Sequence, residues 1–150
     1  MRVIALPEPQ VPGAERFTLR IERWHPTRLN ELLGHPMHRA RRKTADAQLI
    51  AYSCRDAGVT RATVPRAVMV TIALAPRQRA GDPDAYWKSL LDALTHAGAI
   101  VNDNRQWCEL RPVQFARAAQ PATVIELDDV VLQTHTVAAA DARRPDVEEL

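Results

Sequence analysis

The sequence predicts a single compact α+β domain of α/β type, in which a mixed β-sheet packs with two main helices in the order β-α-β-α-β-β. Three observations lead to this prediction. The chain has 150 residues, of which 46% are hydrophobic and 25% charged, as in ordinary globular domains. Segments with the period of strands alternate with two segments that have the period of helices. No internal repeat is visible.

The domain is expected to occupy residues 17–132. Prolines interrupt residues 1–16, which lack periodicity, and we expect an N-terminal arm there. Residues 133–150 contain more acidic than basic side chains and are expected to form a flexible tail.

The first predicted strand, 17–24, alternates apolar and polar positions and ends at His25-Pro26. The first predicted helix, 38–58, is amphipathic and ends at Gly58. Its first half is basic and is expected to face solvent or phosphate. Its second half carries an apolar stripe at spacings of three and four residues, which consists of Ala47, Ile50, Ala51 and Cys54.

The second predicted strand, 66–76, is a nearly unbroken apolar run between prolines. Such a run is typical of a strand that is buried on both faces, and we expect it to be the central strand. The second helix, 82–98, is expected to begin with Asp82 as its cap and Pro83 at its first position, and to end at Gly98. Its predicted buried stripe consists of Trp87, Leu90, Leu91 and Leu94.

Two further strands are expected after the second helix. Residues 99–116 contain a short apolar stretch, an Asn-Asp-Asn turn and a strand, and residues 121–132 form the last strand. The three tryptophans are expected in the core or in a dimer interface.

The charges are divided unevenly along a chain whose net charge is +2. Residues 17–117 carry a net charge of +7 and residues 118–150 a net charge of −5. This division favours a polyanionic partner, although a solvated basic face explains the charge equally well.

Cysteine spacing and hydropathy exclude several classes of protein. Cys54 and Cys108 match no zinc-binding spacing, and we expect free thiols in a reducing, cytoplasmic setting. No apolar run approaches the roughly 20 residues that span a bilayer, and prolines interrupt the first residues before a signal-peptide core. Membrane insertion and secretion are therefore not expected.

Three aspartates are candidates for a metal site. Asp82 and Asp84 are two residues apart, so their side chains can converge only at the beginning of the second helix. Asp103 lies in the following turn and would reach the same place if the helix packs across the sheet. Mg²⁺ is commonly held by one or two carboxylates together with phosphate oxygens of a substrate. Lys88, four residues after Asp84, would then neutralise charge that develops on a phosphodiester during hydrolysis.

The same residues also have a purely structural interpretation. Asp82 and Asp84 are what a well-capped helix needs at its first turn. Lys88, between Asp84 and Asp92, is compatible with a surface ladder of ion pairs. Asp103, between two asparagines, is a common turn residue. The spacing alone does not decide between the two interpretations.

The segment DPDAYWKSLLDALTHAGAIVNDNRQW, residues 82–107, resembles the RusA family of Holliday-junction resolvases. The family pattern has Asp-x-Asp-Asn, a lysine four residues after the second Asp, Asp-Ala-Leu with a following glycine, and an Asp-Asp turn. The order of elements extends the resemblance over about residues 17–130. The positions that match the pattern occur here without a gap and are Asp82, Asp84, Lys88, Asp92, Ala93, Leu94, Gly98 and Asp103.

This resemblance implies a small homodimeric endonuclease that binds four-way DNA junctions and makes paired nicks with Mg²⁺ or Mn²⁺. It implies that Asp82, Asp84 and Asp103 bind the metal and that Lys88 is the essential lysine. A cytoplasmic, nucleoid-associated and phage-related protein is expected by the same analogy. The expected phosphate contacts are Arg39, Arg41, Arg42, Lys43, Arg77 and Arg79.

Two departures from the family pattern keep other functions open. Ala85 replaces the usual asparagine, and Asn102 replaces the first acid of the pair. The first change removes a polar amide close to the metal, and the second removes a negative charge near it. One alternative is therefore a junction-binding or architectural protein that cleaves weakly or not at all. Another is a metal-free interaction domain without either activity.

Overall fold

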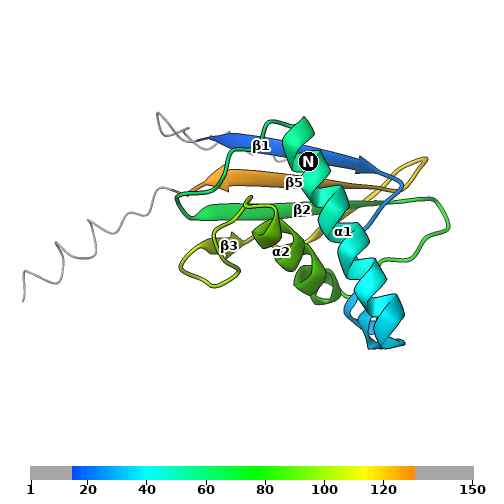
Figure 1. The fold of residues 1–150 in the computed structure, drawn as a ribbon. Coiled ribbons are helices and arrows are strands. Elements are labelled where there is room, and N and C mark those ends of the chain that lie inside the picture. Colours follow the sequence, from blue (N-terminus) through cyan, green and yellow to red (C-terminus); the bar gives the residue numbers. More distant parts are fainter. Residues whose placement is uncertain (1–14, 131–150) are drawn as a thin grey trace, which may run out of the picture.

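The computed structural model describes residues 15–130, which form a five-stranded mixed sheet with two α-helices on one face (Figure 1). The predicted α+β fold is confirmed. The long elements are β1 (Arg16–Glu22), α1 (Pro36–Asp56), β2 (Arg66–Leu74), α2 (Trp87–His96) and β5 (Ala122–Asp129). The short ones are the 3-10 helices η1 (Leu29–Leu33) and η2 (Pro83–Tyr86) and the strands β3 (Cys108–Leu110) and β4 (Gln114–Arg117).

The strands follow the order β1-β5-β2-β3, with β4 pairing β2 farther along the same edge. β5 is antiparallel to both β1 and β2, whereas β3 and β4 are parallel to β2. Three strands follow α2 where two were predicted, because the expected strand within 99–116 is divided at Pro112. Proline has no N–H to donate to a neighbouring strand, so it interrupts the ladder.

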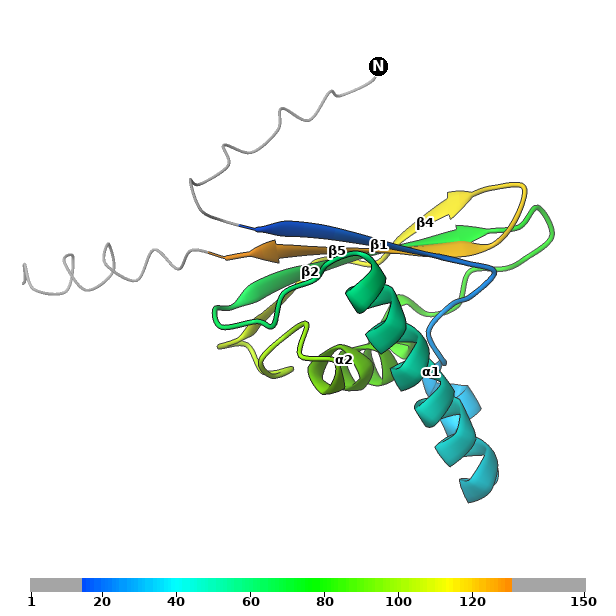
Figure 2. The same cartoon turned by 45° about the horizontal axis from the view of Figure 1, so that its top comes forward.

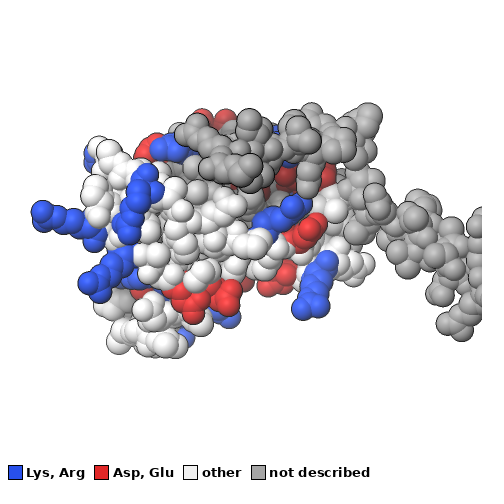
Figure 3. Space-filling model, turned by 180° about the vertical axis from the view of Figure 1, so that it is seen from behind, with Lys and Arg blue, Asp and Glu red and all other residues white. Residues whose placement is uncertain are grey.

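β2 lies inside the sheet, as predicted, but only one of its faces is fully buried. Alternate residues from Arg66 to Leu74 are buried beneath the helices. The prediction of burial on both faces is wrong for Met69, Thr71 and Ala73, which are half-buried because no described element covers the other face. The middle of that open face carries few charged side chains (Figure 3).

α1 begins two residues earlier than predicted because His35 caps it. The Nδ1 atom of His35 accepts the Met37 N–H at 3.2 Å, and Pro36 occupies the first turn. The helix ends before Gly58, whose φ of 70° stops a right-handed helix. Ile50 and Cys54 are buried as predicted, whereas the alanines of the predicted stripe are half-buried.

α2 follows η2 and runs back beneath the sheet. Leu90, Leu91 and Leu94 are buried as predicted, and Trp87 is half-buried. Gly98, with a φ of 75°, lies just beyond its end. The chain leaves the end of β2, passes through α2 and then enters β3, which is parallel to β2 and pairs with its beginning. The two ends of α2 therefore lie near opposite ends of β2 (Figure 1).

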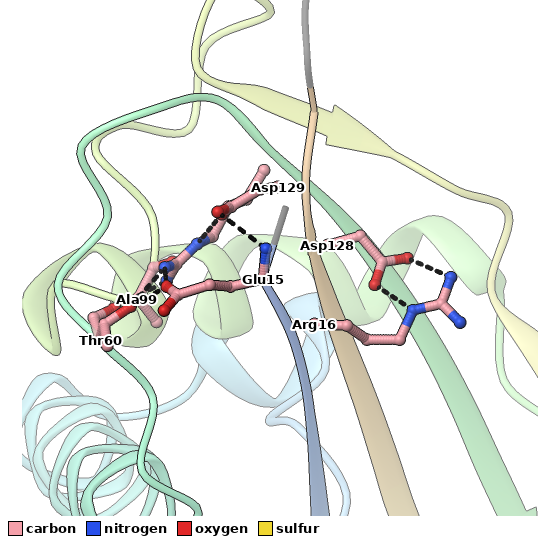
Figure 4. A network of polar contacts seen from close by, with 7 residues as sticks. Glu15, Arg16, Thr60, Ala99, Asp128 and Asp129 are labelled. Atoms are coloured by element: carbon pink, nitrogen blue, oxygen red, sulfur yellow. Dashed lines mark hydrogen bonds and ion pairs between the residues drawn. The ribbon is translucent and has the colours of Figure 1, made fainter. Parts of the chain in front are cut away.

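The beginning of β2 is held by the guanidinium of Arg66, which is 2% exposed. It donates to Asp129 on β5 at 2.8 Å and to the carbonyl oxygens of Thr60 and Ala99 at 2.8 and 2.9 Å (Figure 4). The ring of Phe17 lies 5.0 Å from its centre. This buried charge therefore joins β1, β2, β5 and two loops.

Candidate functional site

The beginning of α2 presents two of the three predicted carboxylates. Asp82 caps η2, and its Oδ1 accepts the backbone N–H of Asp84 at 3.1 Å. Both side chains are exposed. The predicted cap is therefore confirmed, and the Asp84 carboxylate remains directed to solvent without a hydrogen bond within the described residues.

Tyr86 holds this end of α2 in place. Its ring is buried and packs edge-on against His25 and Phe115, with ring centres 6.1 Å apart in each pair. Its hydroxyl accepts the Gly81 N–H at 3.2 Å. A Cβ atom at Gly81 would lie 2.8 Å from that hydroxyl oxygen, so only glycine fits without displacing the tyrosine. The backbone that leads into Asp82 is thereby fixed.

The loop between β2 and η2 carries Arg77 and Arg79, the two predicted phosphate contacts of this segment, and both side chains are exposed. Arg117, at the end of β4, donates from Nη1 to the carbonyl oxygens of Ala75 and Gln78. Gln78 in turn accepts the Ala75 N–H through its side chain at 3.2 Å. These bonds order the loop that carries the two exposed arginines and leads into η2.

Lys88 lies exposed on the first turn of α2. Within residues 15–130, no ion pair of 4.0 Å or less joins it to Asp84 or Asp92. The ladder of ion pairs that offered a structural explanation for Lys88 is thus not formed. Its ammonium is available to an external anion.

Asp103 lies at the other end of α2. It borders a groove of about 500 Å³ beside the beginning of β2, together with Pro65, Cys108 and Val130. Its own N–H is held by the Asn102 side chain at 2.7 Å. Asp82 and Asp84, by contrast, adjoin Tyr86, which contacts Phe115 next to Ile72. Ile72 lies six strand residues, or about 20 Å, from Arg66, the first residue of β2. Asp103 and the other two aspartates therefore lie near opposite ends of β2.

The three aspartates therefore do not meet within one chain. No group of three or more His, Cys, Asp or Glu side chains that could hold a metal ion occurs between residues 15 and 130. The predicted three-carboxylate site does not fit a metal ion in a single chain. Asp82 and Asp84 alone still supply the one or two carboxylates that Mg²⁺ commonly takes from a protein.

The other predicted basic residues lie on the N-terminal half of α1. Arg39, Arg41, Arg42 and Lys43 are all exposed. Basic side chains also project at the end of the sheet where β2 leads into the loop toward α2 (Figure 3). Among the four, Arg42 lies 3.5 Å from Glu31 of η1. The pKa of Glu31 is lowered, because hydrogen bonds from Arg28 outweigh the effect of burial, which raises it.

Asp46 fixes α1 against its neighbours through four hydrogen bonds. Its carboxylate accepts from the Trp24 indole at 3.2 Å, from the Thr27 N–H and hydroxyl at 3.1 and 2.6 Å, and from the Ser89 hydroxyl at 3.0 Å. It is 6% exposed. The basic half of α1 is consequently held at a set position relative to the beginning of α2.

A groove of about 520 Å³ lies between α1 and α2, next to the hydrogen bond between Asp46 and Ser89. Lys43 and Gln48 line one side, and Asp92 and His96 line the other. Neither Asp46, Arg117 nor this groove was predicted from the sequence. Their partners are remote in the chain, so spacing contains no signal for them; only the polar Asp46 beside an apolar stripe hints at a buried role.

No protein-family model and no curated protein matches this chain. Between residues 15 and 130, no helix is both long and apolar enough to cross a bilayer. Cys54 and Cys108 are buried free thiols, as predicted, and burial raises the pKa of each to about 11. At neutral pH both thiols are therefore almost entirely protonated and are expected to be slow nucleophiles.

Proposed function

We propose that this protein is a metal-dependent, structure-specific DNA endonuclease that resolves four-way junctions by paired nicks, as the RusA-like segment implies. The observation that supports this best is the exposed end of α2. There Asp82, Asp84 and Lys88, which forms no ion pair with the part of the chain that the structure describes, follow the ordered loop that carries Arg77 and Arg79. Carboxylates that hold a cation and a lysine that meets phosphate suit phosphodiester hydrolysis.

In this proposal the chain's own residues bind and orient the substrate. Asp82 and Asp84 would hold Mg²⁺ or Mn²⁺, which supplies an activated water and charge neutralisation when bound. Lys88 would contact the oxygens of the scissile phosphate, and the basic loop would contact the neighbouring backbone. Symmetric nicking requires two such sites, so we include a homodimer in the proposal. Because the proposed substrate is branched DNA, the proposal includes a cytoplasmic location in association with the nucleoid.

A synthetic four-way junction tests this function. The wild-type protein is expected to nick opposing strands in Mg²⁺ or Mn²⁺ and to leave them intact in excess chelator. Asp84→Asn and Lys88→Ala are expected to bind the junction without nicking it. Full cleavage by both variants would reject the roles assigned to these residues.

The second candidate is a protein that binds junctions but cleaves them weakly or not at all. The position of Asp103 at the far end of α2 favours it, because one carboxylate is thereby missing from the site of a single chain. Ala85, directly after Asp84, also lacks the amide of the family pattern, and Asn102 lacks its carboxylate. Binding without nicking by wild type, together with nicking by Ala85→Asn, whose new amide adjoins Asp84, would select this candidate.

A further inference from the structure

The N-terminal half of α1 extends away from the sheet, with η1 beside it (Figure 2). All ten residues from 36 to 45 are exposed, and Asp46 is the first buried position of the helix. At 1.5 Å per residue, this projecting half of α1 is about 15 Å long. Because no apolar stripe holds it to the body, its surroundings must stabilise it in another way.

The charges of the projecting half are all of one sign. It contains Arg39, Arg41, Arg42 and Lys43 and no acidic residue. Within residues 15–130, Arg42 is the one member with an ion pair, to Glu31 at 3.5 Å. Cations this close on one helix repel one another. An anionic partner would remove that repulsion.

The four cations are not confined to one side of the helix. At 100° per residue, Arg39, Arg42 and Lys43 lie on the side that continues the buried stripe of Ile50. Arg41 lies roughly opposite. A flat anionic surface would meet one side alone, whereas a groove between two phosphate backbones meets both. The major groove of B-DNA, about 12 Å wide, admits an α-helix.

Two other partners fit less well. A helix that lies in a membrane surface needs an apolar face with large side chains, and Met37 is the one large apolar residue between 36 and 45. A second copy of the chain would place four cations against four cations if these segments paired. Double-stranded DNA supplies both the charge and the two-walled shape.

We propose that the projecting half of α1 enters the major groove of a duplex DNA arm, with Arg41 contacting one backbone and the cations of the opposite side contacting the other. This inference rests on the proposed function, and it adds how one arm of the junction is held. The Asp46 hydrogen bonds transmit the position of that arm to the end of α2, because Ser89 belongs to α2.

Binding of fluorescent DNA junctions over a range of salt concentrations tests the charge. The variant Arg39→Gln, Arg41→Gln, Lys43→Gln leaves the Glu31 partner in place. Its matched control is Arg55→Gln, Arg61→Gln, Arg105→Gln, three exposed arginines elsewhere. Loss of three phosphate contacts lowers the slope of log affinity against log salt by about 2.7. The control is expected to keep the wild-type slope within about 1.

Two further measurements test the groove. An RNA duplex of the same sequence has similar charge but a deep, narrow major groove that side chains cannot read. The triple variant is therefore expected to lose at least tenfold more affinity for DNA than for RNA. Ala45→Pro keeps every charge but interrupts α1 between the projecting half and Asp46, and it is expected to weaken DNA binding at least tenfold.

The outcomes separate this inference from the proposed function. A wild-type protein that binds no DNA at low salt would reject both. If wild type binds, equal slopes for the triple variant and its control would overturn the inference alone. Equal losses on DNA and RNA, or full affinity of Ala45→Pro, would overturn insertion into the groove. Binding to vesicles with about 30% phosphatidylserine, but not to DNA, would replace it with a membrane contact.

Discussion

Replacement of Asp46 by asparagine tests how α1 is held, since the new side chain is almost the same size. The Oδ2 atom of Asp46 accepts three hydrogen bonds, and Oδ1 accepts one from the Trp24 indole. An asparagine oxygen can occupy the Oδ2 position and keep three of them, but its NH₂ group then faces the indole N–H. One donor loses its partner and the remaining bonds lose the charge. We expect the free energy of unfolding to fall by about 2–3 kcal/mol.

Urea unfolding followed by circular dichroism measures this change. With a typical slope of about 1–3 kcal/mol per molar urea, the midpoint is expected to fall by about 0.7–3 M. Asp56→Asn, at an exposed position near the end of α1, is the matched control and is expected to change stability by less than about 0.5 kcal/mol. Equal midpoints for the two variants would show that the four hydrogen bonds contribute no net stability.

Three further predictions follow from packing, thiol burial and the separation of the carboxylates. Gly81→Ala must displace the Tyr86 hydroxyl, and thermal melting is expected to show a loss of about 1–3 kcal/mol; an unchanged melting temperature would contradict the tight contact. With a pKa of about 11 instead of 9.0, Cys54 and Cys108 are expected to react with iodoacetamide at pH 8 roughly 100-fold more slowly than an ordinary thiol, with a rate that increases about tenfold per pH unit; rapid labelling of the folded protein would refute this. Asp103→Asn is expected to nick junctions within about tenfold of the wild-type rate, because Asp103 is remote from the other two aspartates. A complete loss would instead require Asp103 to act in a site shared with a second chain.

Local patterns predicted the elements of this fold well. The alternation of Leu19 and Ile21 marks β1, and the leucines of α2 mark its buried side. Glycines with positive φ follow both helices where the sequence predicts their ends. These signals are local because each depends on the backbone of a few neighbouring residues.

Properties that depend on how elements pack could not be predicted in the same way. Nothing near Met69 in the sequence shows that helices cover only one face of β2. Asp46 resembles a solvated helix residue until Thr27 and Ser89 are placed beside it. The distance between Asp84 and Asp103 depends on the direction of α2 relative to the sheet, which the spacing of nineteen residues leaves undetermined.

The proposed function rests on the carboxylate and lysine at the exposed beginning of α2. The most direct test is the rate of Mg²⁺-dependent nicking of a four-way junction by wild type, Asp84→Asn and the Asp56→Asn control, with junction binding measured in parallel. We predict paired nicks by wild type and control, and a rate at least 100-fold lower for Asp84→Asn at unchanged affinity. Equal nicking by all three proteins would contradict the account.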